Sequence, residues 1–527
     1  MSESPSHNLS MLLMDSARRH PALPALAVGA AVRNDYRGLA ARVTRGAGAL
    51  RGAAPMAGER VAIVSSNCAE YIETMFACWH AGACVVPVNS KLHVDELAYV
   101  LADSGARWAF VDARWAVALS PISVRAPALE RVIELGSPDY ERLFVAAAVE
   151  EPAAVAPEAA AWLFYTSGTT GRPKGVVLTH ANLRAMSRCF LTDVESVAPG
   201  DALLHPAPLS HGSGLYVIPH VLAAAVNIVP ESAGFDAGEV VALLTHWPGA
   251  AFFAAPTMLK RLIAHPAIGH ARLDHLKSIV CGGAPLYVED IKAALAALGP
   301  RLAQIYGQGE SPMTITAMSR AIVAEAAARG DDARLGSVGR AQTGIEVRIE
   351  SQGGAGDRGD GEQDGVRHRD LPGEVLVRGP TVMRGYWRNA EATAAALAGG
   401  WLHTGDVGVL DADGFLTLKD RSKDLIISGG SNIYPREVEE VLQMHAGVRE
   451  VAVVGRRDAQ WGEEVVACVV AHAGLDHATL ERELDALCLA RIARFKRPKA
   501  YVFLRELPRN NTGKVVKTAL REAIVKR

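Results

Sequence analysis

Residues 165–175 of this 527-residue chain read YTSGTTGRPKG, and this stretch decides the fold prediction. Apolar residues precede it at 159–164 and follow it at 176–178, a context typical of strand, loop and strand. Its glycines lack Cβ atoms, so backbone N–H groups can close around a phosphate, while four Ser and Thr hydroxyls and Lys174 add donors and charge. The order differs from GxxxxGK[ST], which excludes a P-loop of the Walker type. The stretch therefore predicts a phosphate-binding loop between two strands.

Short apolar runs alternate with helical patterns on either side of this loop. Residues 60–65 read as a strand, and 69–80 read as a helix with apolar side chains at three- and four-residue spacing. Strands are predicted again at 85–88 and 108–111, with a helix at 96–101 between them. This order predicts an α/β fold with mainly parallel sheets.

Composition narrows the class of protein. Lys plus Arg is 55 and Asp plus Glu is 57, so the net charge of −2 gives no overall attraction for nucleic acid or anionic membranes. Hydrophobic residues make up 49% and charged residues 21%, which excludes wholesale disorder. The seven cysteines include no CxxC pair, so we expect buried, reduced thiols rather than a disulfide framework. With no secretory signal and no long apolar run, the expected location is the cytoplasm.

Two regions depart from the main pattern. Residues 351–370 contain glycines and charges with almost no apolar side chains, and we expect a loop between two strands there. The last hundred residues read as a separate small α/β unit. Its predicted helices are 435–445, 479–490 and a basic helix from 515, and its predicted strands are 451–454, 465–470 and 500–504.

Seven further segments accompany the loop, in a fixed order along nearly the whole chain. They are PLSH at 208–211, GGAPL at 282–286, YGQGE at 306–310, GP at 379–380 with GYW at 385–387, WLHTGD at 401–406, DRSKD at 420–424 and PRNNTGK at 508–514. Together the eight segments resemble the adenylate-forming superfamily, which includes acyl-CoA synthetases, adenylation domains of peptide synthetases and beetle luciferases. The resemblance is strongest to ligases that join fatty or aryl acids to coenzyme A.

The resemblance implies a two-domain α/β enzyme. A large N-terminal domain, residues 1–419, would carry mixed or parallel sheets flanked by helices and would hold nucleotide and acid. Residues 420–424 would form the hinge, and 425–527 a small mobile domain. The implied reaction joins a carboxylic acid to ATP, giving acyl-AMP and pyrophosphate, and then transfers the acyl group to coenzyme A with release of AMP.

Several motif residues also have an interpretation of their own. Tyr306 offers an aromatic face on which adenine could stack, and Glu310 is a lone carboxylate suited to a magnesium ion shared with ATP phosphates. Asp406 lies in a tight turn where it could accept hydrogen bonds from ribose hydroxyls. Most members of the family have Thr or Ser where this chain has Gly309, so one phosphate contact is expected to be missing. Lys514 resembles the lysine that stabilises charge on the reacting phosphate.

By resemblance, the catalytic residues are Lys514, Glu310, Thr170 and His211, with Glu310 as the metal ligand and His211 as the gate of the carboxylate site. Lys423 matches the hinge, and Gly429 and Gly430 would line the pantetheine tunnel. The full set of nucleotide- and coenzyme-binding positions is Thr166, Ser167, Gly168, Thr169, Thr170, Lys174, Gly283, Ala284, Pro285, Gln304, Ile305, Tyr306, Gly307, Gly309, Asp406, Arg421, Lys423, Gly429, Gly430, Asn432 and Lys514.

The acid and the acceptor stay open. Glycines at 212, 214, 283 and 307 predict a roomy apolar pocket, which favours a fatty or aryl acid over acetate. The expected partners are the small-molecule acid, ATP, Mg²⁺ and coenzyme A, without nucleic acid or an integral membrane segment, and a homodimer is left open. Two alternatives are a stand-alone adenylation enzyme that charges an acyl carrier protein and a catalytically silent homologue, for which Gly309 is the only support.

Overall fold

The structure is a computed structural model that describes residues 7–119, 125–166, 172–351, 371–421, 424–428, 431–459, 461–510 and 513–525. Its largest sheet has nine strands in the order β15-β14-β13-β12-β11-β9-β10-β1-β2. Their bounds are β15 (Arg340–Ala341), β14 (Ser311–Met318), β13 (Leu302–Gln308), β12 (Leu276–Cys281), β11 (Ala250–Ala254), β9 (Ala202–Leu204), β10 (Val226–Val229), β1 (Pro24–Val28) and β2 (Ala31–Asp35). The strands from β13 to β1 are parallel to their neighbours, and the antiparallel pairs lie at the two edges.

A second sheet carries the glycine-rich loop. Its seven strands run in the order β18-β8-β7-β4-β3-β5-β6. Their bounds are β18 (Gly385–Tyr386), β8 (Lys174–Thr179), β7 (Ala160–Thr166), β4 (Cys84–Asn89), β3 (Arg60–Ser65), β5 (Trp108–Val111) and β6 (Arg131–Glu134). The predicted strand–loop–strand is confirmed, since β7 and β8 flank the loop and pair antiparallel.

Helices lie between and outside these two sheets. In the large domain they are α1 (Ser10–Arg19), α2 (Tyr36–Ala53), α3 (Ala69–Ala81), α4 (Val94–Ser104), α5 (Ala113–Ala118), α6 (Pro138–Leu143), α7 (His180–Cys189), α8 (Gly212–Leu222), α9 (Ala237–His246), α10 (Pro256–Ile263), α11 (Val288–Leu298), α12 (Arg320–Ala328), α13 (Asp332–Leu335) and α14 (Ala390–Ala396). The predicted helix at 69–80 is α3, whose apolar side chains are buried and which ends at Gly82 with φ 91°. One core contains buried residues of both large sheets and of α2, α3 and α8.

A four-stranded antiparallel sheet completes the large domain. Its order is β16-β17-β19-β20, with bounds β16 (Glu346–Ser351), β17 (Gly373–Arg378), β19 (Leu402–Leu410) and β20 (Leu416–Arg421). The predicted loop at 351–370 falls, apart from Ser351, outside the described residues, and the strands before and after it pair antiparallel.

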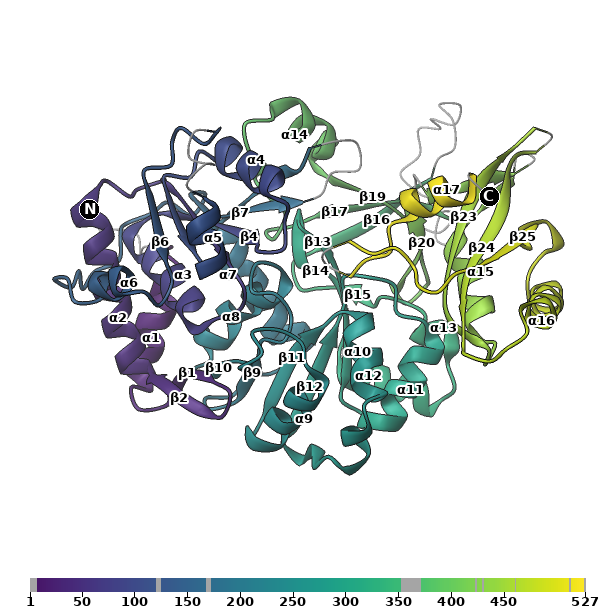
Figure 1. The fold of residues 1–527 in the computed structure, drawn as a ribbon, viewed down its shortest axis with the longest axis horizontal. Coiled ribbons are helices and arrows are strands. Elements are labelled where there is room, and N and C mark those ends of the chain that lie inside the picture. The colour runs from purple at the N-terminus through teal and green to yellow at the C-terminus, as the bar shows by residue number, and fades with distance from the viewer. Residues whose placement is uncertain are drawn as a thin grey trace.

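The C-terminal region forms its own sheet and cores. Strands β21 (Ile426–Ser428), β22 (Ser431–Ile433), β23 (Val448–Asp458), β24 (Gly462–Ala471) and β25 (Ala500–Phe503) pack against α15 (Pro435–Gln443), α16 (His477–Arg491) and α17 (Lys517–Val525). Each predicted element of this unit is present, although β23 and β24 are longer than predicted and α15 ends two residues earlier. Figure 1 shows this small domain at one end of the molecule, with α1 and α2 at the other end.

The α/β prediction is therefore confirmed, whereas the domain boundaries at 419 and 424 stay predictions. The expectation of reduced cysteines agrees with the structure, in which all seven are free and six are buried. Across the described ranges, no helix is both long and apolar enough to cross a membrane.

Candidate functional site

Two hairpins from different sheets meet at the centre of the site. The turn between β13 and β14 contains Gly309 and Glu310, and it lies against the end of β7. A Cβ atom at Gly309 would lie 2.6 Å from Cγ2 of Thr166 and 3.0 Å from Cδ1 of Phe164. The close approach gives a steric reason for glycine where the family usually has a hydroxyl residue, because Thr166 occupies the space a side chain would need.

Three side chains on β13 and β19 form a hydrogen-bonded cluster around one carboxylate. Oη of Tyr306 donates to Oδ2 of Asp406 at 2.6 Å, and Nε2 of Gln308 donates to the same oxygen at 2.6 Å. Nε2 of Gln308 also donates to the carbonyl oxygen of Thr404 at 2.9 Å. Asp406 is 7% exposed and Tyr306 is 8% exposed. The cluster fixes the Tyr306 ring and the Asp406 carboxylate relative to each other before any ligand binds.

Glu310 follows this cluster on the β13–β14 hairpin and contacts the Tyr386 side chain. Its Oε1 atom accepts a hydrogen bond from Oη of Tyr386 at 2.8 Å. Burial raises the pKa of Tyr386, and the Glu310 carboxylate raises it further, so Tyr386 stays a donor at neutral pH. Nζ of Lys174 lies 5.1 Å from the centre of the Tyr386 ring. Glu310 and Lys174 therefore both lie near the Tyr386 side chain, and the Glu310 carboxylate is a ligand type suited to a hard cation.

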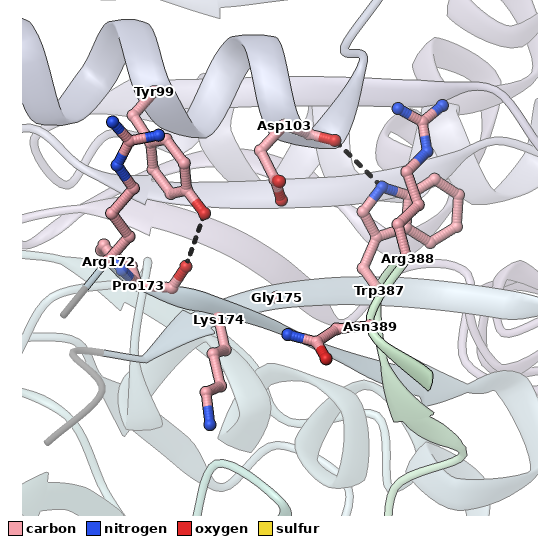
Figure 2. A pocket seen from close by; sticks show the side chains of 9 residues that line it. All are labelled: Tyr99, Asp103, Arg172, Pro173, Lys174, Gly175, Trp387, Arg388 and Asn389. Atoms are coloured by element: carbon pink, nitrogen blue, oxygen red, sulfur yellow. Dashed lines mark hydrogen bonds between the residues drawn. The ribbon is translucent and has the colours of Figure 1, made fainter. Parts of the chain in front are cut away.

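A polar cavity of about 240 Å³ lies at the base of the loop, next to the start of β8. Figure 2 shows its lining residues, among which the Lys174 side chain points away from Tyr99 and Asp103. Oη of Tyr99 donates to the carbonyl of Pro173 at 3.1 Å, and the Trp387 indole donates to the carbonyl of Asp103 at 3.0 Å. These bonds tie α4 to the residue before β8 and to the residue after β18, so they support the base of the loop.

Aromatic side chains surround the predicted gate residue, His211. Its ring meets Phe164 edge-on at 5.4 Å, and Nδ1 lies 2.9 Å from Oγ of Ser210. Burial lowers the pKa of His211 to about 4, which leaves the imidazole neutral at physiological pH. Phe253, on β11, stacks on Tyr216 of α8 at 5.5 Å, and Gly283 with φ 84° leaves its Cβ position 3.8 Å from Phe253. Aromatic side chains are thus gathered beside the GGAPL loop.

Gly214 and Gly307 were predicted to make room in the acyl pocket, but their missing Cβ atoms face neighbouring backbone instead. A Cβ at Gly214 would lie 1.9 Å from the carbonyl oxygen of Leu209, and one at Gly307 would lie 2.5 Å from the backbone nitrogen of Met313. Both glycines are required by close backbone contacts. Gly212 and Gly283 keep their expected place next to Phe253.

The C-terminal domain brings the Lys514 turn to the large domain. Arg509 and Val515 pair across this turn, Gly513 has φ 83°, and Oδ1 of Asn510 accepts the Lys514 N–H at 2.9 Å. A Cβ at Gly513 would lie 3.5 Å from Oγ1 of Thr257, in the first turn of α10. The turn therefore contacts the same domain that carries the Tyr306–Asp406 cluster.

Some of the remaining predicted site residues lie on described elements, and others lie outside the described residues. Gln304, Ile305, Tyr306, Gly307 and Gly309 follow one another along the β13 hairpin, and Ala284 and Pro285 lie in the GGAPL loop. Asn432 is exposed on β22, and the Arg421 backbone pairs with Asp406 across β19 and β20. Predictions at Ser167, Gly168, Thr169, Thr170, Lys423, Gly429 and Gly430 lie outside the described residues, as does the Arg421 side chain.

Sequence reasoning missed four residues that complete the site. Gln308 and Tyr386 belong to the YGQGE and GYW motifs, so their motifs could have indicated them. Phe253 and Tyr216 belong to ordinary apolar runs and carry no comparable signal.

Comparison with known proteins identifies the family. Residues 13–387 match the model described as AMP-binding enzyme, and residues 437–514 match the AMP-binding enzyme C-terminal domain. The chain belongs to the AMP-binding enzyme family. The resemblance inferred from the eight motifs is confirmed.

Several curated relatives of this AMP-binding enzyme are acid–CoA ligases, whereas a relative from Streptomyces coeruleorubidus, 32% identical over 92% of this chain, is a fatty acid–[acyl-carrier-protein] ligase. A feruloyl-CoA synthase from Amycolatopsis sp is 37% identical over 491 residues, covering 92% of this chain and 93% of that protein. A long-chain-fatty-acid–CoA ligase from Mycobacterium tuberculosis is 33% identical, covering 98% of each chain. An indoleacetate–CoA ligase from Aromatoleum aromaticum is 35% identical, covering 93% of each. The chain is therefore an enzyme of the AMP-forming acid–CoA ligase family.

A solved structure agrees over the whole length of this AMP-binding enzyme. ATP-bound MatB from Rhodopseudomonas palustris superposes with a TM-score of 0.85 at 29% identity, covering 98% of this chain and 99% of that chain.

Proposed function

We propose that this enzyme is an ATP-dependent ligase that joins an aryl carboxylic acid to coenzyme A. The observation that carries the proposal is the prearranged group of Tyr306, Gln308 and Asp406 next to Glu310, with the aromatic side chains around His211 adjoining it. Tyr306 would stack on adenine, and Asp406 would accept hydrogen bonds from the ribose hydroxyls.

The chemistry has two balanced steps. A carboxylate oxygen of the acid attacks the α-phosphorus of ATP, the bond to the β-phosphate oxygen breaks, and pyrophosphate leaves with that electron pair. In the second step the coenzyme A sulfur attacks the carbonyl carbon of acyl-AMP, AMP leaves with the electrons of the C–O bond, and the thiol proton passes to solvent. Lys514 would stabilise the negative charge that develops on the phosphate oxygens in the first step.

The residues present fit a magnesium ion bound with ATP. The Glu310 carboxylate, which accepts a hydrogen bond from the Tyr386 hydroxyl, supplies an oxygen ligand of the kind that magnesium prefers. Bound there, the ion would neutralise phosphate charge. Lys174, on the Tyr386 side of β8, would add a fixed positive charge on the same wall.

The aromatic side chains near His211 favour an aryl acid. Phe164 meets His211 edge-on and Phe253 stacks on Tyr216, and aromatic ligands pack well against such rings. The feruloyl and indoleacetate ligases among the relatives support this choice, while the fatty-acid ligase keeps a fatty acid as the second candidate.

The test is a pyrophosphate-release assay with ferulate, indoleacetate and a long-chain fatty acid, each with and without coenzyme A. We expect the highest kcat/KM with an aryl acid, and acyl-CoA as the product by mass spectrometry. A preference for the fatty acid would overturn the aryl assignment. Acyl-AMP that accumulates with coenzyme A present but transfers to an acyl carrier protein would replace coenzyme A by the carrier. Failure to release pyrophosphate with any acid would favour a silent homologue.

A further inference from the structure

One hydrogen bond crosses from the large domain to the helix that supports the Lys514 turn. Oη of Tyr287 donates to Oε2 of Glu439 at 3.0 Å. Tyr287 immediately precedes α11 and follows the GGAPL loop, whereas Glu439 lies in the middle of α15 of the small domain. The bond therefore joins a loop of the acyl and nucleotide site to the domain that is expected to move.

The Glu439 carboxylate is buried and fully engaged. It is 4% exposed, and its Oε1 atom accepts the Val453 N–H at 2.8 Å and lies 3.0 Å from Nζ of Lys517. Because a buried carboxylate is stable only when its oxygens are paired, losing the Tyr287 donor leaves Oε2 poorly satisfied. Burial and the Glu439 charge both raise the pKa of Tyr287, so its hydroxyl remains a donor.

The same carboxylate reaches the Lys514 turn. Lys517 begins α17, three residues after Lys514, and its ammonium group is paired with Glu439. Tyr287, Glu439 and Lys517 thus form a continuous chain of contacts from the large domain to the segment that carries Lys514. A second contact joins the domains on the same face of α15, where the Arg436 guanidinium lies 3.5 Å from the carbonyl of Gly336.

We propose that Tyr287 is a positioning residue that holds the small domain in the orientation used for acyl-AMP formation, and that its bond to Glu439 breaks when the small domain turns for thioester formation. The inference rests on the proposed function, because it assumes two half-reactions with different domain orientations. Tyr287 acts through Glu439 and Lys517 and touches no substrate. Its effect falls on the first half-reaction alone, since that step requires Lys514 beside the large domain.

The test compares Tyr287→Phe with Tyr36→Phe. The Tyr36 hydroxyl also makes one hydrogen bond, to the carbonyl of Ala225 at 2.7 Å, but it is buried within the large domain. With the aryl acid that releases pyrophosphate fastest, we expect Tyr287→Phe to lower ATP–pyrophosphate exchange about tenfold, as for a lost hydrogen bond to a charged group. Thioester formation from supplied acyl-AMP should stay within about twofold of wild type. Tyr36→Phe should leave both rates, pyrophosphate exchange and thioester formation, close to those of the wild type.

Two further measurements keep the result specific to domain orientation. Glu439→Gln should reproduce the loss, and Tyr287→Phe combined with Glu439→Gln should lose little more than either single variant. Hydrogen exchange in the peptide covering residues 513–525 should be faster in Tyr287→Phe than in Tyr36→Phe. Equal loss of both half-reactions, additive single losses, or unchanged exchange in that peptide would overturn the proposal.

The proposed function can fail separately. If the wild-type enzyme exchanges pyrophosphate but makes no thioester with coenzyme A, the acceptor assignment is wrong. The Tyr287 inference is then still decided by pyrophosphate exchange and by the 513–525 peptide, because neither measurement needs coenzyme A.

Discussion

The two ends of the site are built in opposite ways. At the nucleotide end, Tyr306 and Gln308 both donate to the Asp406 carboxylate, so the polar groups are paired before ATP arrives. At the acyl end, Phe164 meets His211 edge-on and Phe253 stacks on Tyr216. The contrast indicates a nucleotide end fixed by hydrogen bonds and an acyl end formed by aromatic packing.

The largest effect concerns Lys514, the residue of the small domain that the proposed mechanism assigns to the nucleotide end. Lys514→Ala should lower acyl-AMP formation by about 100-fold or more, because the developing phosphate charge loses its cation. Thioester formation from supplied acyl-AMP should persist, as measured by acyl-CoA yield. Equal losses in both half-reactions would show that Lys514 serves the whole site.

A change within the paired cluster should act on ATP alone. Asp406→Asn replaces the acceptor of two donors by an amide, and we expect the KM for ATP to rise about thirtyfold with little change in the KM for the acid. Tyr306→Phe, which keeps the ring and removes one donor, is the matched control and should have a smaller effect. Initial rates at varied ATP and varied acid decide the point, and a comparable rise in both KM values would contradict the separation of the two ends.

A substitution at Glu310 tests whether magnesium binds at the nucleotide end. Glu310→Gln should raise the Mg²⁺ concentration needed for half-maximal pyrophosphate release about tenfold, since an uncharged amide is a weaker ligand. Tyr386→Phe removes only the hydrogen bond to Glu310 and should leave the Mg²⁺ requirement close to wild type. An unchanged Mg²⁺ dependence in Glu310→Gln would assign Glu310 a structural role.

Gly309 lies where the nucleotide end meets β7. Gly309→Ser should slow acyl-AMP formation about fivefold, because its Cβ would lie 2.6 Å from Cγ2 of Thr166 and the hairpin would shift. Thr166→Ser removes that methyl group, so the double variant should regain most of the rate relative to Thr166→Ser alone. A Gly309→Ser enzyme faster than wild type would mean that the missing hydroxyl limits phosphate binding.

The smallest effect comes from the acyl end and concerns stability. Burial lowers the pKa of His211 to about 4, so between pH 6.5 and 4 the unfolded chain binds a proton that the folded protein does not. The free energy of unfolding therefore falls as the pH falls through this window. Going from pH 7.5 to 6.0, His211→Phe should lose about 0.8 kcal/mol less than wild type in urea denaturation. Identical losses in the two proteins would show that His211 titrates normally.

The nucleotide end could be predicted from the sequence because its residues belong to short motifs. Tyr306 and Glu310 are four residues apart on one hairpin, so a local pattern fixes their geometry. The acyl end could not be predicted in the same way. Phe253 and Tyr216 come from separate elements, and their meeting depends on how β11 and α8 pack. Gly214 and Gly307 were misinterpreted because a sequence does not show whether a missing Cβ faces a ligand or a neighbouring carbonyl.

The interface between the domains was the least accessible to sequence analysis. The Lys514 turn was predicted from its motif, but Tyr287 and Glu439 lie about 150 residues apart in segments that look like ordinary helix starts and surfaces. Their pairing depends on the orientation of two separately folded units, which no local periodicity encodes.

The short strand β18 bears on how the chain folds during synthesis. Gly385 and Tyr386 pair with Val177 and Val176 on β8, and the Trp387 N–H donates to the Gly175 carbonyl at 2.7 Å. The hairpin that carries the glycine-rich loop therefore has an open edge until about 200 further residues have emerged from the ribosome, roughly 10–40 s at ordinary elongation rates. During that interval β8 is an unprotected edge strand, available to other nascent chains. The large domain is thus expected to need chaperone protection between translation of β8 and of β18, and ribosome-bound chains stalled before residue 385 should aggregate more readily than chains stalled just after residue 387.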